Sequence, residues 1–285
     1  MSDDSSPLAG AAPDLPPLAA MPLAAVPLTG PSGAPVLVLG NSLGTSAAVW
    51  DRQVPQLQQG FRLLRFELPG HGGSAAPPGD YTIAGLGAGV LGLLDSLGLD
   101  RVGYCGISIG GMIGLWLAAH APDRIAALGL VCTSAYLPPA AGWLARADQV
   151  RVAGMASVCG PVISRWFTAQ YAAQAPAVVD AVRTELARTD PGGYAGCCAA
   201  IAGMDLRPAL AAISAPTLVL AGAEDPATPL EHSEVIAREI PGARLDVIPA
   251  AAHLAAVSAP AEVTSALEAH LLAALVRSGD QYFWR

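Results

Sequence analysis

The chain of 285 residues contains no lysine, and its 15 basic residues, all arginine, are outnumbered by 23 acidic ones. The formal net charge is therefore −8. Proteins that bind nucleic acid present clustered positive charge to phosphates, so this balance disfavours a nucleic-acid partner and also an anionic membrane surface. Only 13% of the residues are charged and 53% are hydrophobic, which is typical of a packed globular core rather than of a disordered chain.

Cysteine is also scarce, with five in the chain, two of them adjacent and none in a C-x-x-C pair. An odd number without metal-ligand spacing indicates neither a disulfide framework nor a zinc site, so we expect no metal and a cytoplasmic location. The N-terminal stretch lacks the positive region of a secretory signal, because the first basic residue is Arg52. No apolar run approaches the ~18–20 residues of a membrane span. Nothing in the sequence specifies an oligomeric state.

Short and nearly continuous apolar runs, bounded by turn residues, recur along the chain. Such runs suit parallel strands that are buried on both faces of a sheet. Helix-length stretches separate them, and this alternation predicts an α/β fold with a doubly wound, mostly parallel sheet. The expected strands are 35–39, 61–66, 102–105, 127–131, 217–220 and 244–248, and the expected helices are 83–97, 111–120 and 261–276.

The stretch from 136 to 207 interrupts this alternation, because it is helical in composition, holds several aromatic residues and contains no strand-like run. We interpret it as a helical cap inserted between two segments of the sheet. Residues 1–34 are poor in charge and rich in Ala, Pro and Gly, which predicts a loose arm with one short edge strand near 21–28. The expected units are the N-terminal arm at 1–34, the α/β core at 35–135 and 208–276, the cap at 136–207 and a C-terminal tail at 277–285.

The strongest local signal is the pentapeptide Gly106-Ile107-Ser108-Ile109-Gly110, which lies between an expected strand and an expected helix. A G-x-S-x-G pattern in this context is a nucleophile elbow, in which glycines permit a sharp turn that exposes the serine. The alternative is a glycine-rich turn with an incidental serine, which the flanking elements disfavour. We therefore expect Ser108 to be a nucleophile at the start of a helix, with the amide of Ile109 free to donate to an oxyanion.

A serine hydroxyl becomes an effective nucleophile only beside a base that takes its proton and an acid that orients the base. In chains with this elbow, the acid follows the serine and the histidine follows the acid. Asp225 and His253 follow the last two expected strands in that order, so both loops open at the edge of the sheet that carries Ser108. Glu224 is the alternative acid. Asp225 alone would fit a simple turn before Pro226, but a carboxylate and a histidine at two strand ends favour the catalytic interpretation.

A tetrahedral intermediate needs a second donor opposite the amide of Ile109. The turn after the first expected strand includes Asn41-Ser42-Leu43-Gly44 and lies where this fold places its oxyanion loop. The amide of Ser42 is the first choice for the donor, and that of Leu43 is the alternative. His71 lies in a Gly-His-Gly turn, and we interpret it as a structural residue near the site rather than as a base.

Together these residues resemble the 3-oxoadipate enol-lactonases, α/β-hydrolases that act in the β-ketoadipate pathway of bacterial aromatic-acid breakdown. The resemblance extends from about residue 35 to residue 272. The strings that carry it are Asn41-Ser-Leu-Gly-Thr45, Gly106-Ile-Ser-Ile-Gly-Gly-Met112, Arg165-Trp-Phe-Thr168, Gly193-Tyr-Ala-Gly-Cys-Cys-Ala-Ala-Ile201, Met204-Asp-Leu-Arg207 and Ala221-Gly-Ala-Glu-Asp-Pro-Ala-Thr-Pro229.

The resemblance implies that the chain hydrolyses 3-oxoadipate enol-lactone to 3-oxoadipate with no metal or organic cofactor. It places the family's catalytic triad on Ser108, Asp225 and His253. The sequence departs from the family pattern where Ile109 replaces the usual Met, and where Glu67-Leu-Pro69 replaces the usual Asp-x-Arg. We expect these changes to leave the geometry of the triad intact, whereas substrate preference and rate are more sensitive to them.

The substrate implied by the resemblance is a small lactone that carries a carboxylate, although the protein is itself an anion. An arginine is then needed to bind the carboxylate by a charge-assisted contact. For each arginine the alternative is a solvated surface charge. The candidates are Arg146, Arg151 and Arg165 of the cap, with Trp143 and Trp166 as apolar walls.

The same triad also suits other functions. Within enzymes, a broad carboxylesterase, a perhydrolase and a carbon–carbon bond hydrolase use this arrangement, and the cap alone discriminates among them. Outside enzymes, the scaffold suits a ligand receptor that turns over slowly or not at all. A fluorophosphonate probe separates the last case, because a receptor without an activated serine reacts weakly.

Overall fold

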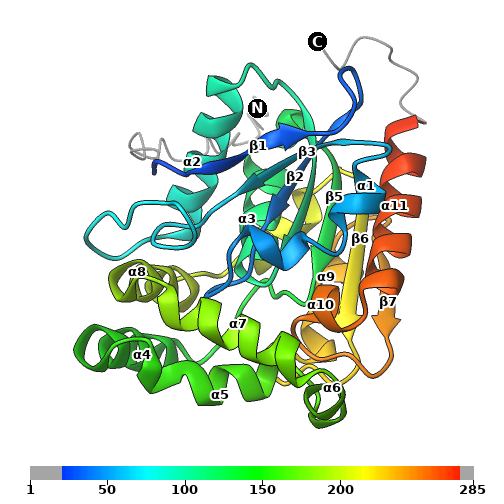
Figure 1. The fold of residues 1–285 in the computed structure, drawn as a ribbon. Helices are drawn as coiled ribbons and strands as arrows, with labels where there is room; N and C mark the ends of the chain where they lie inside the picture. The colour runs from blue at the N-terminus through cyan, green and yellow to red at the C-terminus, as the bar shows by residue number, and fades with distance from the viewer. Residues whose placement is uncertain (1–20, 277–285) are drawn as a thin grey trace, which may run out of the picture.

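The structure, a computed structural model, describes residues 21–276 and contains a seven-stranded sheet with helices on both faces (Figure 1). The strands are β1 (Ala25–Thr29), β2 (Val36–Gly40), β3 (Arg62–Phe66), β4 (Val102–Ile107), β5 (Ile125–Val131), β6 (Thr217–Gly222) and β7 (Arg244–Ile248). Their order in the sheet is β1-β3-β2-β4-β5-β6-β7. β1 runs antiparallel to β3, and the other neighbouring pairs are parallel. The predicted α/β class with a doubly wound, mostly parallel sheet is confirmed.

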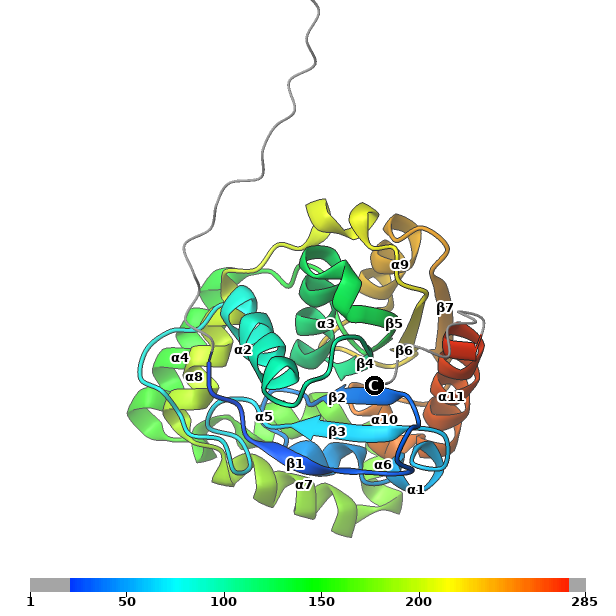
Figure 2. The same cartoon turned by 90° about the horizontal axis from the view of Figure 1, so that it is seen from above.

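Helices cover both faces of the sheet, which is why its central strands are apolar throughout. Every residue of β2 and β4 is buried. One face carries α2, α3 and α9, and the other carries α1 and α11 (Figure 2). The bounds of these helices are Val54–Leu57 for α1, Ile83–Ser96 for α2, Ile109–His120 for α3, Leu230–Glu239 for α9 and Pro260–Val276 for α11.

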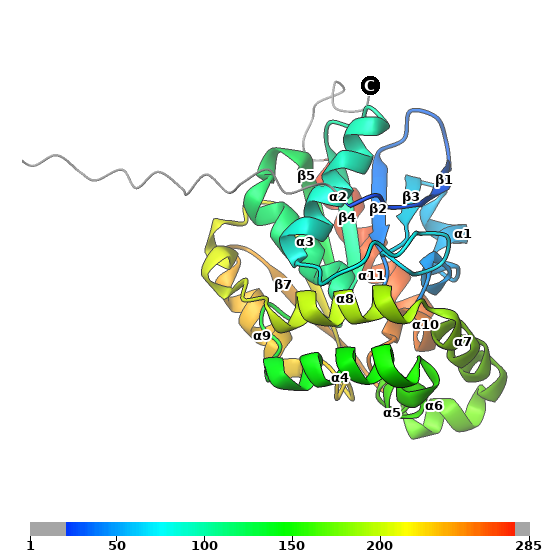
Figure 3. The ribbon, with the colours of Figure 1, turned by 90° about the vertical axis from the view of Figure 1, so that its left-hand side faces the viewer.

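Five further helices lie between β5 and β6 and cover the carboxyl ends of the strands (Figure 3). We call these helices the cap. The side chain of Asp190 begins the last of them by accepting a hydrogen bond from the amide of Gly193 at 2.9 Å. The cap helices are α4 (Ala140–Ala153), α5 (Ala156–Trp166), α6 (Ala169–Gln174), α7 (Pro176–Arg188) and α8 (Pro191–Ala202).

The part of the predicted N-terminal arm that the structure describes contains one strand. The edge strand expected near 21–28 is present as β1, which pairs with β3. Leu23 packs against α2 at Gly89, where a Cβ atom would lie 3.3 Å from Leu23 Cδ1. Leu23 is half-buried and packs against the hydrophobic core. Residues 1–20 and the predicted tail at 277–285 lie outside the described residues.

Three further observations apply to residues 21–276. All five cysteines are buried and have free thiols. No group of three or more His, Cys, Asp or Glu side chains in this range is placed to hold a metal ion. None of the helices in the same range combines the length and the apolar character that crossing a membrane requires.

Candidate active site

Ser108 occupies the sharp turn that the sequence predicts between β4 and α3. Its backbone angles are φ 55° and ψ −120°, a region that residues with a side chain rarely adopt. The turn requires Gly106, because a Cβ atom there would lie 2.2 Å from the carbonyl carbon of Gly110. The amide of Ser108 donates to the carbonyl of Val131 at 3.0 Å, and Thr133 Oγ1 donates to the carbonyl of Ser108 at 2.6 Å. Bonds from the neighbouring strand and loop therefore hold the strained residue in place.

Asp225 and His253 meet at the same edge of the sheet. His253 Nδ1 donates to Asp225 Oδ2 at 2.8 Å, and both residues are buried. Thr228 Oγ1 donates to the same carboxylate oxygen at 2.7 Å, and the amides of Ala227 and Thr228 donate to Oδ1 at 2.8 and 3.1 Å. Glu224 is exposed and takes no part in this arrangement. Of the two acids considered from the sequence, the structure therefore places Asp225 beside the histidine.

The surroundings of Asp225 determine its charge and the tautomer of His253. Burial raises the pKa of the Asp225 carboxyl, but the adjacent His253 and the hydrogen bonds from Thr228 outweigh burial and hold the pKa below its usual range. The carboxyl is therefore ionised at neutral pH and keeps the hydrogen of the imidazole on Nδ1. Nε2 is left as the basic nitrogen. Thr228 was not identified from the sequence, although a threonine three residues after an aspartate is a recognisable turn signal.

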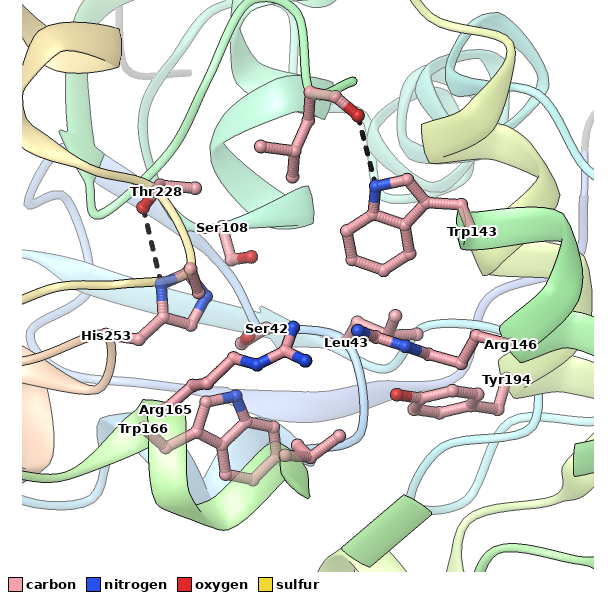
Figure 4. Close-up of a pocket in the computed structure, with 13 residues that line it drawn as sticks. Ser42, Leu43, Ser108, Trp143, Arg146, Arg165, Trp166, Tyr194, Thr228 and His253 are labelled. Atoms are coloured by element: carbon pink, nitrogen blue, oxygen red, sulfur yellow. Dashed lines mark hydrogen bonds between the residues drawn. The ribbon is translucent and has the colours of Figure 1, made fainter. Parts of the chain in front are cut away.

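Ser108 and His253 line one cavity, with the Ser108 hydroxyl pointing into it beside the imidazole (Figure 4). The structure shows no hydrogen bond between Ser108 Oγ and His253 Nε2. Contacts between a nucleophile and its base are commonly looser before substrate binds. The serine, the acid and the histidine predicted from the sequence are therefore brought to one site, with the serine hydroxyl oriented toward the space that a ligand would fill.

The segment Asn41–Thr45, which we call the oxyanion loop, follows β2 and borders the cavity through Ser42 and Leu43. Among the described residues, none accepts a hydrogen bond from the amide of Ser42 or of Leu43. The amide of Ile109 belongs to the first turn of α3, where amides have no partner within the helix. The predicted donors are thus amides that remain available to a ligand.

His71 fixes the far end of the oxyanion loop. Its Nε2 accepts a hydrogen bond from the amide of Gly44 at 2.8 Å, and its Nδ1 donates to the carbonyl of Pro69 at 2.9 Å. Burial lowers the pKa of His71 to about 4, so the ring is neutral and can accept at Nε2. The interpretation of His71 as a structural residue near the site is confirmed.

The cap supplies one wall of the cavity. Arg146 lies over the ring of Trp143, with 4.5 Å between its Cζ and the ring centroid, and Arg165 and Trp166 project from α5 (Figure 4). Neither arginine forms an ion pair with an acidic side chain of the described residues. Tyr194 of α8 also lines the cavity and was not identified from the sequence, because its role depends on how the cap folds over the core.

Arg151, the third arginine considered from the sequence, does not line this cavity. Its guanidinium pairs with Asp80 in the loop before α2 and lies 3.5 Å from Asp148. Arg151 and Arg146 share α4 but are five residues apart, which is about 140° around the helix axis, so the two side chains point in different directions. Arg151 therefore joins the cap to the core, and its assignment to substrate binding is corrected.

Glu67, at the position where the sequence departs from the family pattern, lies just after β3. Its Oε2 accepts a hydrogen bond from the amide of Ala47 at 3.0 Å. Burial, the largest effect, and the nearby Glu185 raise the pKa of Glu67 from its usual 4.5 to about 7, against lowering effects of the Ala47 amide and Arg65. The native state therefore binds a proton on this carboxyl more tightly than the unfolded chain does.

This raised pKa makes stability depend on pH. Between pH 4.5 and about 7 the native state holds the Glu67 proton and the unfolded chain does not, so the free energy of unfolding falls as pH rises through this window. We expect Glu67→Gln to remove this dependence. The quantity to compare is the melting temperature of the variant minus that of the wild type. Allowing for solvent screening, this difference should be about 2–4 °C larger at pH 8 than at pH 5. Thermal denaturation at both pH values measures the difference, and an equal offset at each would contradict the expectation.

The family to which the chain belongs follows from comparison with known proteins. A model of the alpha/beta hydrolase fold family matches residues 35–260, and the chain belongs to this family. Among curated proteins, 3-oxoadipate enol-lactonase 2 of Acinetobacter baylyi is 37% identical over 240 residues, which cover 84% of this chain and 90% of the relative. The chain is therefore an ester hydrolase, and the resemblance to enol-lactonases seen in the sequence is confirmed.

Solved structures agree with this assignment. The enol-lactonase from Burkholderia xenovorans LB400 is 38% identical with a TM-score of 0.85, and the match covers 87% of this chain and 96% of that one. A hydrolase from Pseudomonas aeruginosa PA01 is 44% identical with a TM-score of 0.85, covering 87% of this chain and 94% of the other.

Proposed function

We propose that this chain opens 3-oxoadipate enol-lactone to 3-oxoadipate, with Ser108, Asp225 and His253 as its catalytic triad. Arg146 and Arg165 bind the carboxylate of the substrate in this proposal. The observation that carries it is that these two guanidinium groups line the cavity of Ser108 and His253 without an acidic partner among the described residues. In a protein of net charge −8, two such cations at one cavity suit an anionic ligand.

In the first half of the reaction, Ser108 Oγ attacks the carbonyl carbon of the lactone while His253 Nε2 takes its proton. The ionised Asp225 stabilises the imidazolium that forms. The negative charge that develops on the carbonyl oxygen is received by the amide of Ile109 and by that of Ser42, or alternatively of Leu43.

Collapse of the tetrahedral intermediate breaks the ring bond between the carbonyl carbon and the ring oxygen, whose electron pair becomes that of an enolate. An enolate is a weaker base than an alkoxide, so ring opening requires less proton donation from His253 than an alkyl ester does. The enolate oxygen takes the proton held on His253 Nε2, which gives an enol and restores the base. Water then attacks the acyl group on Ser108 while His253 Nε2 takes a proton from it, and that proton returns to Ser108 Oγ as the acyl–oxygen bond breaks. The released enol becomes the ketone of 3-oxoadipate by moving a proton from oxygen to carbon.

The cap residues suit the shape of this substrate as well as its charge. The indole rings of Trp143 and Trp166 offer flat apolar surfaces on which a planar lactone ring packs. The stacking of Arg146 on Trp143 restricts the guanidinium, so less conformational entropy is lost when it pairs with a carboxylate.

Removing the cavity arginines tests this proposal. We expect Arg146→Ala and Arg165→Ala to raise KM for the enol-lactone about 10- to 100-fold, the loss of a charge-assisted contact of ~1.5–3 kcal/mol. KM for p-nitrophenyl acetate, which has no carboxylate, should stay within twofold. Steady-state kinetics on both substrates make the measurement.

Arg151→Ala is the matched control for these variants, because it removes the same charge from the same cap but lies outside the cavity. It should change KM for neither substrate. Equal effects of the Arg146 and Arg165 variants on the lactone and on the neutral ester would remove the carboxylate-binding role from the proposal.

A further inference from the structure

The oxyanion loop runs directly into a short 3-10 helix, η1 (Ala47–Trp50), whose first amides have no partner within the helix. Two carboxylates accept hydrogen bonds from these amides. Glu67 accepts from Ala47, and Glu185 Oε1 accepts from Ser46, the residue that follows the oxyanion loop. Acceptors therefore fix the chain directly after the oxyanion loop, three to five residues beyond the amides proposed to receive the oxyanion.

The two carboxylates come from different parts of the fold. Glu67 follows a core strand, whereas Glu185 belongs to α7 of the cap and lies 139 residues beyond Ser46 in the sequence. The neighbouring cap residue Leu186 packs against the oxyanion loop itself, because a Cβ atom at Gly44 would lie 2.5 Å from Leu186 Cδ1. One turn of α7 therefore contacts the oxyanion loop by packing and the segment after it by a hydrogen bond.

We propose that Glu185 is a positioning residue for ester hydrolysis. By accepting a hydrogen bond from the amide of Ser46, it holds the oxyanion loop in the position that its amides need to bind the oxyanion. In this view the cap shapes the oxyanion-binding amides as well as the substrate cavity. The inference rests on the oxyanion loop of the proposed function, but not on the identity of the substrate. It assigns to Glu185 no contact with substrate, since Glu185 lies outside the residues that line the cavity.

The chemistry of the contact supports this role. A hydrogen bond from an amide to an ionised carboxylate is shorter and stronger than one between neutral groups. An oxyanion donor contributes about 10²–10³ in rate and only at close range, so a loop that shifts by a fraction of an ångström loses part of that factor. A loss of about 10-fold in kcat, with little change in KM, is the signature of a displaced donor.

The charge of Glu185 has a second, independent consequence. Glu185 and Arg65 are the charged side chains that act on the Glu67 carboxyl, and Glu185 raises its pKa. Removing the Glu185 charge should therefore lower the pH at which Glu67 ionises. This titration reports on the proximity of the two carboxyl groups, whereas the effect on kcat with KM unchanged reports on the positioning of the oxyanion loop.

The test compares variants of Glu185 in the full chain, with p-nitrophenyl acetate as a neutral substrate. Glu185→Ala should lower kcat about 10-fold with KM within twofold, and Glu185→Gln should stay within threefold of wild type because its amide oxygen still accepts from Ser46. Glu185→Gln should also move the pH-dependent fall in melting temperature to lower pH. The matched control is Asp180→Asn on the same helix, whose carboxylate pairs with Arg183. It should change none of these values.

If Glu185→Ala does not fold, Glu185→Asp serves in its place, because it keeps the charge and withdraws the carboxylate by one methylene. An unchanged kcat in either variant, or a loss confined to KM, would overturn the inference. These outcomes differ from a failure of the proposed function. A wild-type enzyme that hydrolyses the neutral ester but not the enol-lactone contradicts the proposed substrate and leaves the Glu185 comparison intact.

Discussion

Replacing Ser108 by alanine should reduce kcat for the enol-lactone and for neutral esters by up to ~10⁶-fold, the loss seen when a well-evolved triad loses its nucleophile. The reason is that the other hydroxyls at the cavity are placed differently, with that of Tyr194 across the cavity from His253 (Figure 4). Thr228 Oγ1 already donates to Asp225, and Ser42 lies in the oxyanion loop. The measurement is steady-state turnover, together with labelling by a fluorophosphonate probe and mass analysis of the peptide that contains Ser108.

Ser134→Ala is the matched control for this variant. Ser134 is a buried serine beside a histidine, since His232 Nδ1 lies 2.8 Å from its Oγ. Its hydroxyl donates to the carbonyl of Tyr136 at 2.6 Å and lies outside the cavity. Activity and labelling should therefore persist in Ser134→Ala. Near-normal turnover by Ser108→Ala, or a label that remains after that substitution, would remove Ser108 from the mechanism.

Replacing Asp225 by asparagine should lower kcat about 10⁴-fold, because an amide donates where the carboxylate accepts and so stabilises the wrong tautomer of His253. The effect should be large because the carboxylate accepts four hydrogen bonds, including those from Thr228 and His253, which leave it no freedom to rotate away. Thr228→Val removes one of these bonds and should cost only about 10-fold. Steady-state kinetics on either substrate give both values.

The adjacent acid provides the control, because Glu224 is exposed and has the same charge. Glu224→Gln should leave kcat unchanged. Similar losses for Glu224→Gln and Asp225→Asn would mean that the general negative charge of the loop matters rather than one oriented carboxylate.

Much of the site was predictable from the sequence because its signals are local. The elbow around Ser108 is a contiguous pattern, and the ends of parallel strands meet at one edge of a sheet, which brings Asp225 and His253 to it. The helix after Ser108 was expected at residue 111 but begins at Ile109. The glycines at its start weaken the helical pattern, but the tight turn requires them. Gly110 is an example, because a Cβ atom on this residue would lie 2.5 Å from the carbonyl oxygen of Gly40 in β2.

The remaining features depend on contacts that no local pattern records. The helix α9 was not expected, because Ile236 is its one residue that is both apolar and buried. Arg146 and Arg151 share one helix of the cap, and only the packing of that helix on the core places one at the cavity and the other on Asp80. The contact between Ser46 and Glu185 spans 139 residues, so nothing short of the folded chain could predict it.

The proposed function requires that this ester hydrolase recognise an enol-lactone by its carboxylate. The most direct measurement compares kcat/KM for 3-oxoadipate enol-lactone with kcat/KM for its methyl ester, which keeps the ring and removes the charge. We expect kcat/KM to be at least ~10²-fold higher for the free acid, and the ratio of the two values to fall toward one when Arg146 and Arg165 are both replaced by alanine. Equal values for the two substrates in the wild-type enzyme would contradict it.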